Sequence, residues 1–536
     1  PDWKPGEISH LDKMAKVGMY GKPCKAPDKA IVLRPHWQYH LKRNSDRRSC
    51  NFCEGSKRAA AALHAVTSTY SSCVNQPIQR LFFALAAIHD RKVYGGDIKD
   101  AFAHSPSPDV PTYMRIDNQY SEWWKQRYDT NIDRTHVLPV LRCLQGHPES
   151  GKIYERHINQ ILTSKELNFQ ATVHDRCIYQ TTYNGHHILL LRQCDDLAIA
   201  VDDESIAKEI YGIIGAKLQL PGETEPPFTY LGLINDYNGV DVDQRKEYIE
   251  VNASNYIDRV VTSHGWNDSV KSVAPEKPFA PMPEDSVLKV FITTHSTIEG
   301  SAAHEALEKK MGFSYRCLLG ELMYAYVTCC PDIGYSICCL SKFSTCPSEL
   351  HFNFLKGVAI YLKRTKHWGI RYHRQAPTKH TGLEPGCFKD EPLPLPDGYP
   401  PFPDHPAGPN PVCFVDAAYA NDLRKRRSTT GYAIMLAGGA IAWRSKTQST
   451  TALSSTEAEF YAAVSAAKVC LFLRHVLTCL KQPLIGPTLI YEDNEACINV
   501  INARQPTDRT RHIETPYFKI QDWKEQEVIK WFISLR

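Results

Sequence analysis

Two adjacent acidic residues, Asp195 and Asp196, stand between two apolar runs, and no other feature constrains the chain as strongly. Each run, residues 187–192 and 197–201, is long enough for one β-strand, so the pattern predicts a hairpin with both carboxylates at its turn. Like charges this close resist joint ionisation unless a cation neutralises them. The pattern favours a cation site, although an Asp-Asp pair taken alone is as readily a polar hairpin turn.

Asp97 is the residue that could complete such a site. Residues 91–98 have the pattern of a short strand that ends in this acid, and residues 99–102 have a helix-like pattern. Mg²⁺ prefers oxygen ligands, and three carboxylates together with substrate phosphates suit a two-metal phosphoryl-transfer site. Asp97, Asp195 and Asp196 are therefore predicted to hold metal ions together.

A second acidic set, Asp416, Glu457 and Asp493, lies in the last part of the chain. The predicted elements are strands at 412–416, 431–436 and 440–444, a helix at 454–481 with Ser454 or Ser455 as its N-cap, and a strand at 488–493. Glu457 taken alone could be an ordinary acid in the first turn of a helix, where the positive end of the helix dipole stabilises a carboxylate. The joint pattern makes that explanation improbable for the three acids together, so they are candidates for a second, nuclease-type site.

Further motifs surround these acids. They are Arg80-Leu-Phe-Phe-Ala-Leu-Ala-Ala, Leu144-Gln-Gly-His-Pro-Glu-Ser-Gly, His174-Asp-Arg-Cys-Ile-Tyr and Tyr230-Leu-Gly-Leu. In order, spacing and residue type, the region from 77 to 203 resembles the fingers and palm of reverse transcriptases of the Ty1/copia class of LTR retrotransposons. Three later motifs are similar to the connection and RNase H signatures of the same family, and they begin at Tyr315, Lys425 and Ala452. The resemblance extends from about residue 68 to the end.

The resemblance implies an α+β fold: a right-hand polymerase with fingers, palm and thumb, a connection, and a C-terminal α/β RNase H-like domain. A chain of 536 residues is too long for one core, which agrees with several units. The implied parts are an N-terminal arm and start of the fingers at 1–75, fingers and palm at 76–235, a thumb at 236–300, a connection at 301–374, a Pro-rich linker at 375–411 and the RNase H-like domain at 412–536. The arm is expected to be extended, because prolines at 23, 27 and 35 interrupt it. Helical patterns are expected at 77–89, 155–167, 248–265 and 311–364.

The resemblance also implies an activity for each acidic set. The first set would use two Mg²⁺, with Mn²⁺ as a substitute, to extend a DNA primer with dNTPs on an RNA template. In the RNase H fold that the resemblance implies, Asp416, Glu457 and Asp493 would meet at one edge and hold two Mg²⁺ ions, which would activate water to cleave the RNA strand of an RNA–DNA hybrid. Phe102 matches the ring that favours dNTPs by clashing with a ribose 2′-hydroxyl, unless it is only a core aromatic. Gln145 matches the segment that contacts the incoming nucleotide.

Three departures from the family pattern bear on these expectations. The usual Tyr-Val before the two aspartates is Gln193-Cys194, so a ring expected beside the primer is lost. The basic fingers motif is replaced by Arg48-Ser-Cys-Asn-Phe-Cys-Glu-Gly, in which Arg48 could reach a triphosphate but no second basic residue is in register. A fourth acid of the family's RNase H site would lie beyond Arg536 or is absent.

Charge and cysteine content narrow the class of protein. The net charge of +4 is mild. Basic runs at 42–48, 424–427 and 504–511 together suit contacts with phosphates, although any one of these runs could equally be a solvent-exposed basic surface. No apolar run approaches the roughly 20 residues of a membrane span, so no membrane partner is expected. The 18 cysteines predict free thiols, and the spacing of Cys50, Cys53, His64 and Cys73 disfavours zinc.

The resemblance also suggests where the protein works. Relatives are released from a Gag-Pol polyprotein and act in cytoplasmic virus-like particles, often as homodimers; Gag and integrase are expected partners, and the DNA product would lead to the nucleus. The alternative is a domesticated element that binds nucleic acid or protein without catalysis. The six acids disfavour that alternative, whereas the altered residues before Asp195 favour it. RNase H activity alone is disfavoured by the first acidic set.

Overall fold

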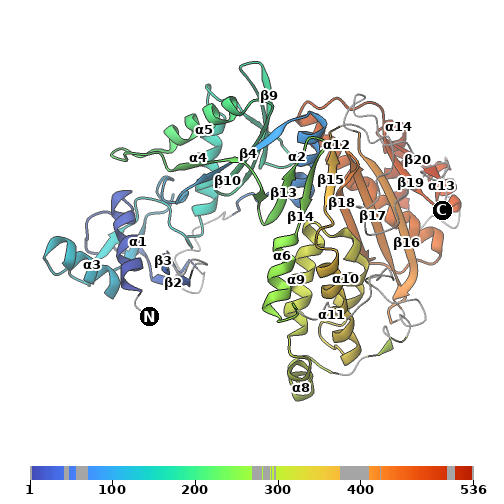
Figure 1. Ribbon diagram of the computed structural model, residues 1–536, viewed down its shortest axis with the longest axis horizontal. Helices are drawn as coiled ribbons and strands as arrows, with labels where there is room; N and C mark the ends of the chain where they lie inside the picture. The colour runs from blue at the N-terminus through green and yellow to red at the C-terminus, as the bar shows by residue number, and fades with distance from the viewer. Residues whose placement is uncertain are drawn as a thin grey trace. The chain divides into compact units, whose positions relative to one another are not determined.

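The computed structural model describes residues 3–41, 47–55, 70–267, 281, 290, 293–294, 297–374, 410–422, 424–503 and 514–533. The chain forms two compact units that alternate along the sequence (Figure 1). The first unit comprises residues 1–74, 93–171 and 176–233, and the second comprises 75–92, 172–175 and 234–536. The six-part division expected from the sequence stays a prediction.

Several predicted features lie outside the described residues. They are nearly all of the Pro-rich linker at 375–411, most of the basic runs at 42–48 and 504–511, much of the thumb beyond residue 267, His64 and Arg536.

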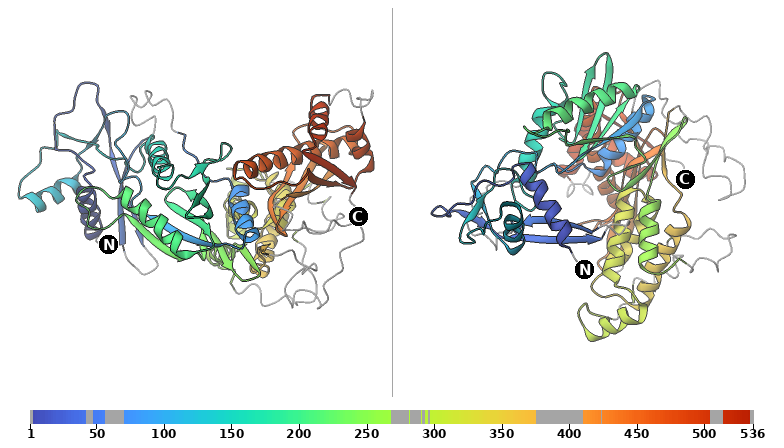
Figure 2. Two further views of the ribbon diagram at one scale, coloured as in Figure 1. Left: turned by 90° about the horizontal axis from the view of Figure 1, so that it is seen from above. Right: turned by 60° about the vertical axis from the view of Figure 1, so that its left-hand side comes forward.

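A six-stranded sheet forms the centre of the first unit, with strand order β11-β4-β10-β9-β8-β7. The strands are β4 (Lys92–Ile98), β7 (Gln170–Ala171), β8 (Ile178–Tyr183), β9 (His186–Gln193), β10 (Asp196–Val201) and β11 (Phe228–Leu233). Helices α4 (Ser150–Leu162) and α5 (Glu204–Leu218) share one hydrophobic core with the sheet (Figure 2). The expected hairpin is confirmed, because β9 and β10 pair antiparallel with Asp196 opposite Gln193.

The N-terminal residues are more ordered than an extended arm. They form α1 (Lys4–Lys16), β1 (Ile31–Leu33) and the hairpin of β2 (Pro35–Leu41) and β3 (Arg47–Cys53). Strand β1 joins β5 (Thr112–Arg115) and β6 (Val137–Pro139) in a small sheet, and α3 (Asn118–Tyr128) follows β5. Leu11 of α1 belongs to the core of this region. The expectation of an extended segment was wrong because prolines at 23, 27 and 35 fall outside the helix, and Pro5 occupies its first turn, where proline is tolerated.

The second unit contains a four-stranded sheet and a group of helices. The strands, in the order β12-β13-β14-β15, are Asp236–Tyr237, Val240–Gln244, Tyr248–Asn252 and Ile370–His373. The helices are α2 (Gln76–Ile88), α6 (Ser254–Ser263), α8 (Ala302–Met311), α9 (Tyr315–Thr328), α10 (Gly334–Ser341) and α11 (Glu349–Arg364), with the short η2 (Pro331–Ile333) before α10. The helical expectation for 311–364 is confirmed. The expected helix at 248–265 is partly wrong, because its first five residues form β14 and pair with β13 and β15.

A five-stranded sheet with order β18-β17-β16-β19-β20 completes the second unit. The strands of this sheet and the helices between them are, in chain order, β16 (Val412–Asp422), β17 (Arg427–Leu436), β18 (Gly439–Thr447), α12 (Ser455–Cys479), β19 (Thr488–Glu492), α13 (Glu495–Asn502), α14 (Glu514–Glu525) and β20 (Ile529–Ile533). The predicted order of three strands, a helix and a strand is confirmed. Ala437 and Gly438, both at positive φ, make the tight turn between β17 and β18.

Arg80 is a buried cation that joins three elements of the second unit. Its guanidinium donates to the carbonyl oxygens of Ile441, Val327 and Thr328 at 2.8 Å each. The guanidinium also lies 3.7 Å from the ring centre of Trp443. Burial lowers the Arg80 pKa to about 10. These contacts connect α2 with α9 and β18, which gives the Arg80 motif a structural role.

Helix α12 is long and apolar enough, by length and composition alone, to cross a membrane. Half of its most apolar window is buried inside the structure. It carries Glu457 and Glu459 and packs against β16 and β17. These features are those of a core helix in a folded unit.

Candidate functional site

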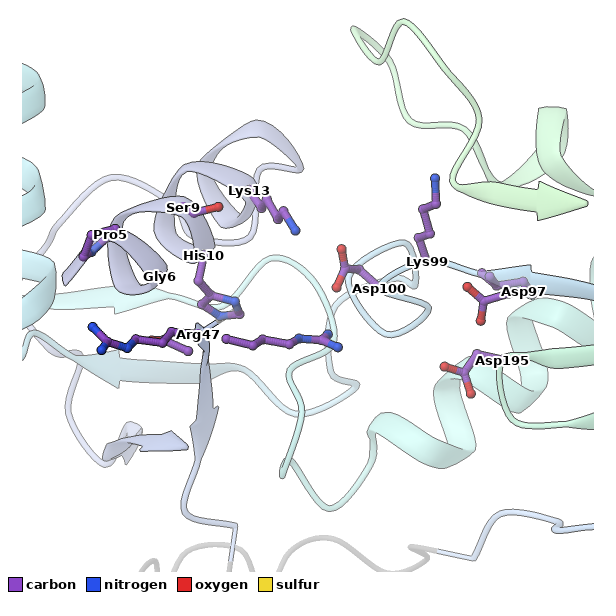
Figure 3. Close-up of a pocket in the computed structure, with 13 residues that line it drawn as sticks. Pro5, Gly6, Ser9, His10, Lys13, Arg47, Asp97, Lys99, Asp100 and Asp195 are labelled. Atoms are coloured by element: carbon purple, nitrogen blue, oxygen red, sulfur yellow. The ribbon is translucent and has the colours of Figure 1, made fainter. Parts of the chain in front are cut away.

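The first acidic set meets at the centre of the six-stranded sheet. Strand β4, which carries Asp97, lies beside β10, and the Ile98 amide donates to the Asp195 carbonyl oxygen at 3.0 Å. Asp97 and Asp195 both line a cavity of about 640 Å³ (Figure 3). Asp196 begins β10 and is half-buried. The structure therefore brings together two of the three predicted acids in one cavity wall, with the third next to them in the chain.

The surroundings of the Asp97 carboxyl raise its pKa. Burial, followed by the negative charge of Asp195, raises the Asp97 pKa above its ordinary value, and the Lys99 ammonium opposes that rise. A divalent cation bound by both carboxylates would favour their charged forms, because its positive charge offsets the repulsion between them. This electrostatic arrangement agrees with a cation site.

The turn of the hairpin has its own supports. Cys194 adopts the left-handed region at φ 50°, and its carbonyl oxygen accepts a hydrogen bond from the Tyr154 hydroxyl at 2.8 Å. The Gln193 side chain accepts from the amide of Val74 at 3.0 Å. Gln193 thus ties the segment that precedes residue 75 to the hairpin, a contact that the sequence did not predict.

The two predicted nucleotide contacts line a neighbouring cavity of about 360 Å³. Phe102, Gln145 and Asp195 all contribute to its wall. The Phe102 ring is half-buried and stands edge-on to Tyr154, with centres 5.8 Å apart. The expectation of a helix at 99–102 was wrong: these residues form consecutive turns, stabilised by the bond from the Ala103 amide to the Asp100 carbonyl oxygen at 2.8 Å.

Gln145 owes its position to a close backbone contact. The Cys53 amide donates to the Gln145 carbonyl oxygen at 3.0 Å. Gly146 has φ +88°, and a Cβ there would lie 2.3 Å from the Cys53 carbonyl oxygen. Only glycine fits this approach, so Gly146 fixes the distance between Gln145 and the end of β3. The roles of Phe102 and Gln145 in nucleotide binding stay predictions.

Four cations line this cavity together with the acids: Lys13, Arg47, Arg48 and Lys99. Lys13 lies across the cavity from Asp97 and Asp195, whereas Lys99 stands beside Asp97 (Figure 3). Arg48 was considered from the sequence, whereas Lys13 of α1 was missed because the N-terminal residues were interpreted as an extended arm. Burial lowers the pKa of His10 to about 4, and its Nε2 accepts from the Asn51 amide at 3.1 Å, so His10 is a neutral member of the wall.

The second acidic set differs from the expected one in one member. Carboxylate oxygens of Asp416, Glu459 and Asp493 lie within 4.8 Å of one another, and they form the group of possible metal ligands found among the described residues. Asp416 and Asp493 are brought together by the parallel pairing of β16 and β19, in which Val415 stands opposite Glu492. The predicted pairing of Asp416 with Asp493 is therefore confirmed as a geometry.

Glu457 does not belong to that group, which corrects the prediction. Its carboxylate accepts from the Leu453 amide at 2.7 Å, and its own amide donates to the Ser454 hydroxyl at 3.2 Å. Both bonds satisfy amides at the start of α12. Two residues along a helix turn by roughly 200°, so Glu457 and Glu459 point in different directions. The second Glu of Glu-Ala-Glu was the signal that the sequence offered.

A fourth carboxylate, also missed from the sequence, lies next to this group. Glu492 is fully buried at the end of β19. Burial raises the Glu492 pKa to about 8, with Asp493 and Asp416 adding to the rise, and it raises the Glu459 pKa to about 9, with Glu492 the next cause. In both residues the Oε2 atom is buried and has no hydrogen-bond partner among the described atoms. Such oxygens fit a site that is completed by a cation.

The described cysteines bear on two expectations, free thiols and the disfavoured zinc site that would include His64. Each cysteine among the described residues is a free thiol, as expected. Cys53 is buried and its pKa is raised to about 12 by burial, which disfavours the thiolate that zinc requires.

Comparisons with known proteins agree with the motifs. The family described as "Reverse transcriptase (RNA-dependent DNA polymerase)" matches residues 24–278. The chain is 23% identical over 532 residues to the "Retrovirus-related Pol polyprotein from transposon TNT 1-94" of Nicotiana tabacum, which covers 97% of this chain and 35% of that protein. It thus spans about a third of the length of that relative.

A shorter relative matches more closely in identity. The "Secreted RxLR effector protein 161" of Plasmopara viticola is 32% identical over 159 residues, which is 30% of this chain and 90% of that protein. Among solved structures, the foamy viral protease-reverse transcriptase in complex with double-stranded DNA aligns with a TM-score of 0.48 at 11% identity, over 99% of this chain and 70% of that one.

Proposed function

Because the chain belongs to the Ty1/copia-type reverse transcriptases, we propose that it is an RNA-directed DNA polymerase that also cleaves RNA in RNA–DNA hybrids. The observation that carries the polymerase proposal is the cavity that Asp97 and Asp195 line together with Lys13 and Arg48. Carboxylates on one wall and cations on the other suit a nucleotide whose triphosphate is bound between metal ions and basic side chains.

Each group in the polymerase site has a separate task. Asp97, Asp195 and Asp196 would hold two Mg²⁺ ions, which would supply positive charge where the primer 3′-hydroxyl attacks and pyrophosphate departs. Arg48 and Lys13 bind the non-transferred phosphates. Phe102 excludes a ribose 2′-hydroxyl from the sugar pocket. RNA template, DNA primer and dNTPs are accordingly the proposed substrates.

The C-terminal site receives a second task. Asp416, Glu459 and Asp493 would hold the metal ions that activate water against a phosphodiester. The two buried Oε2 atoms without partners, on Glu459 and Glu492, support this assignment. The five-stranded sheet with α12 and its strand order support an RNase H-like domain. Glu492 provides a fourth carboxylate beside this group.

Two single substitutions test the separation of the two sites. Asp195→Asn should abolish Mg²⁺-dependent extension of a labelled DNA primer on RNA while the RNA strand is still cleaved. Asp493→Asn should have the opposite effect. Asp129→Asn is the matched control, because Asp129 is an exposed C-cap of α3 in the left-handed region, which asparagine also tolerates. Wild-type behaviour of both site variants would show that these assignments are wrong.

The runner-up is a domesticated protein that binds nucleic acid without catalysis. Gln193 and Cys194, in place of the usual Tyr-Val, are the residues that favour it. Absence of extension by folded wild-type protein, with hybrid binding intact, would establish the runner-up. Under the main proposal the protein works in a cytoplasmic virus-like particle with Gag and integrase, as a homodimer, and accompanies its DNA product to the nucleus.

A further inference from the structure

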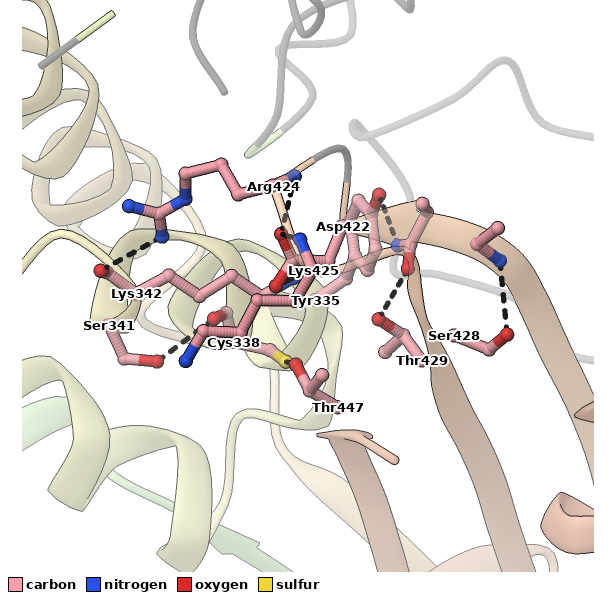
Figure 4. A network of polar contacts seen from close by, with 12 residues as sticks. Tyr335, Cys338, Ser341, Lys342, Asp422, Arg424, Lys425, Ser428, Thr429 and Thr447 are labelled. Carbon is pink, nitrogen blue, oxygen red and sulfur yellow. Dashed lines mark hydrogen bonds and ion pairs between the residues drawn. The ribbon is translucent and has the colours of Figure 1, made fainter. Parts of the chain in front are cut away.

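The cations at the turn between β16 and β17 show how charged side chains are used by contacts within the fold (Figure 4). Asp422 accepts from the amides of Arg424 and Lys425 at 3.1 and 3.4 Å. Its Oδ2 also lies 3.9 Å from the Lys342 ammonium. Arg424 donates to the Lys342 carbonyl oxygen at 3.2 Å and lies over the Phe343 ring. A side chain that serves a ligand has to retain a donor or an acceptor that no such contact satisfies.

His10 of α1 lies where the two cavities of the first unit meet. Its side chain lines the cavity of about 640 Å³ and also the neighbouring cavity of about 360 Å³. Arg48, Asp100 and Asp195 line both cavities as well. A molecule that fills the larger cavity and reaches into the smaller one would therefore pass His10.

One hydrogen bond determines which nitrogen of His10 carries the proton. The Asn51 amide donates to Nε2 of His10 at 3.1 Å, and a backbone N–H group can only donate, so Nε2 accepts with its lone pair. Burial lowers the His10 pKa to about 4, against the charge of Asp100. The charges of Lys13 and Arg48 add to the fall. The ring is therefore neutral at pH 7, and its one proton is on Nδ1.

The surroundings of the ring leave this Nδ1–H group to the cavity. Asp100, Lys13 and Arg48, the charged groups that act on the ring, all line the larger cavity. Trp37 packs edge-on to the ring on another side, with ring centres 5.7 Å apart. Among the described residues Nδ1 has no hydrogen-bond partner, and it is not one of the polar atoms buried without a partner. A molecule in the cavity can thus accept from Nδ1.

The charges around His10 identify a phosphate oxygen as the acceptor. Lys13 and Arg48 put positive charge next to the ring, and Asp97 and Asp195 line the same cavity. Phosphate oxygens accept from cations and also bind the metal ions that carboxylates hold. A third cation would repel those metal ions, whereas a neutral N–H group adds a hydrogen bond without a charge. A cavity of this volume suits a ligand of nucleotide size.

We infer that the Nδ1–H group of neutral His10 donates a hydrogen bond to a phosphate oxygen of the incoming nucleotide. This inference rests on the proposed function, because a nucleoside triphosphate is the proposed occupant of the cavity. Lys13 and Arg48 contribute charge, whereas His10 contributes one directed hydrogen bond. The loss of a hydrogen bond to a charged acceptor weakens binding by about tenfold or more.

Two substitutions separate the two nitrogens of the ring. The side-chain amide nitrogen of asparagine takes the position of Nδ1, so His10→Asn retains the donor to the ligand and loses the acceptor for the Asn51 amide. The side-chain oxygen of glutamine reaches the position of Nε2, so His10→Gln retains that acceptor and loses the donor. A purely structural role of His10 requires the acceptor, whereas the inferred role requires the donor.

The test measures phosphate binding by the full chain without a catalytic step. Calorimetric titration with inorganic tripolyphosphate in Mg²⁺ gives Kd, and steady-state primer extension gives KM for dTTP and kcat. His10→Gln should raise both Kd and KM by about tenfold or more with kcat little changed. His10→Asn should bind like wild type and melt at a lower temperature. His40→Gln is the matched control, because His40 is an exposed histidine of β2 outside both cavity linings.

Several outcomes would overturn the inference. Unchanged Kd and KM in His10→Gln would show that Nδ1 meets no phosphate. A greater loss of affinity in His10→Asn than in His10→Gln would assign His10 to the bond with Asn51 alone. If either variant fails to fold, ¹⁵N spectra of histidine-labelled wild type replace it: tripolyphosphate should shift the signal of a protonated Nδ1, and a proton on Nε2 would refute the argument. Failure of wild type to extend a primer would refute the proposed function and leave the tripolyphosphate result intact.

Discussion

Glu492→Gln should stabilise the metal-free protein, although it removes a carboxylate from a site proposed to bind metal. Glu492 is fully buried, and its Oε2 atom has no hydrogen-bond partner among the described atoms. Its Oε1 accepts from the Asn494 amide at 3.1 Å, a bond that the carbonyl oxygen of glutamine can keep. The substitution therefore retains shape and one hydrogen bond while it removes an acid that is costly to ionise.

The magnitude follows from the pKa of this carboxyl. Burial first, and the charges of Asp493 and Asp416 next, raise the Glu492 pKa from 4.5 to about 8. Below pH 4.5 this carboxyl is protonated in both the folded and the unfolded state, so its raised pKa has no effect on stability. As the pH rises from 4.5 towards about 8, the free energy of unfolding falls, because the unfolded chain binds fewer protons than the folded chain. At pH 7.5 the cost approaches about 4 kcal/mol for one such group. The titration of Glu492 is coupled to that of Glu459, so the two residues share part of this cost. We therefore expect the free energy of unfolding to be about 2–4 kcal/mol higher in the variant than in wild type.

Thermal unfolding in EDTA between pH 5 and 8 checks this reasoning. The transition of the second unit should occur about 5 °C higher in Glu492→Gln than in wild type at pH 7.5, and the difference should vanish near pH 4.5. The fall of stability with pH should be about half as steep in the variant, since Glu459 alone then takes up a proton on folding. Mg²⁺ should stabilise wild type more than the variant. A variant less stable than wild type at pH 7.5, or an unchanged slope, would refute the argument.

Three further predictions concern the sites. Glu459→Gln should lower RNA cleavage by about 100-fold or more while primer extension continues, which a hybrid cleavage assay checks. Glu457→Gln should cleave RNA normally but lower the free energy of unfolding by about 1 kcal/mol, because it weakens the start of α12; a melting curve checks this. Lys13→Ala should raise the KM for dNTPs by about tenfold with kcat little changed, because it removes one charge-assisted contact to the triphosphate, and Lys16→Ala on the same helix should match wild type in steady-state extension. Phe102→Ala should reduce the preference for dNTP over rNTP by about tenfold or more in competition assays, and an unchanged preference would reassign Phe102 to the core.

The hairpin and the C-terminal strands could be predicted because their signals are local. The Asp195–Asp196 turn is bounded by two apolar runs, and β9 and β10 pair as that pattern requires. The N-cap of α12 at Ser454 was also predicted correctly, and its hydroxyl accepts from the Glu457 amide. Periodicity and capping residues specify such elements from within a short stretch of sequence.

The features that were missed depend on contacts between distant segments. Glu457 and Glu459 are equally acidic in the sequence, and only the packing of α12 against β16 decides which one meets Asp416. Lys13 reaches the cavity lined by Asp97 and Asp195 because α1 packs on β3, more than 30 residues later in the chain. The residues at 248–252 have a helical pattern, but their amides are used by β13 and β15. Tertiary contacts overrode the local pattern there.

The altered residues before Asp195 are compatible with catalysis for a physical reason. In the proposed function the tetrad has two roles: its aspartates would bind metal, and the residues before them give the turn its shape. Here Cys194 adopts the turn conformation at φ 50° and is tied to Tyr154 through its carbonyl oxygen, a contact that does not depend on the side chain. Gln193 lies at the end of β9, and its amide group is used by the Val74 amide. The turn that presents Asp195 is therefore built by the backbone and by neighbours outside the tetrad. Under the proposed function the replaced side chains would affect contacts with the primer, whereas the backbone turn that presents the two aspartates does not depend on them.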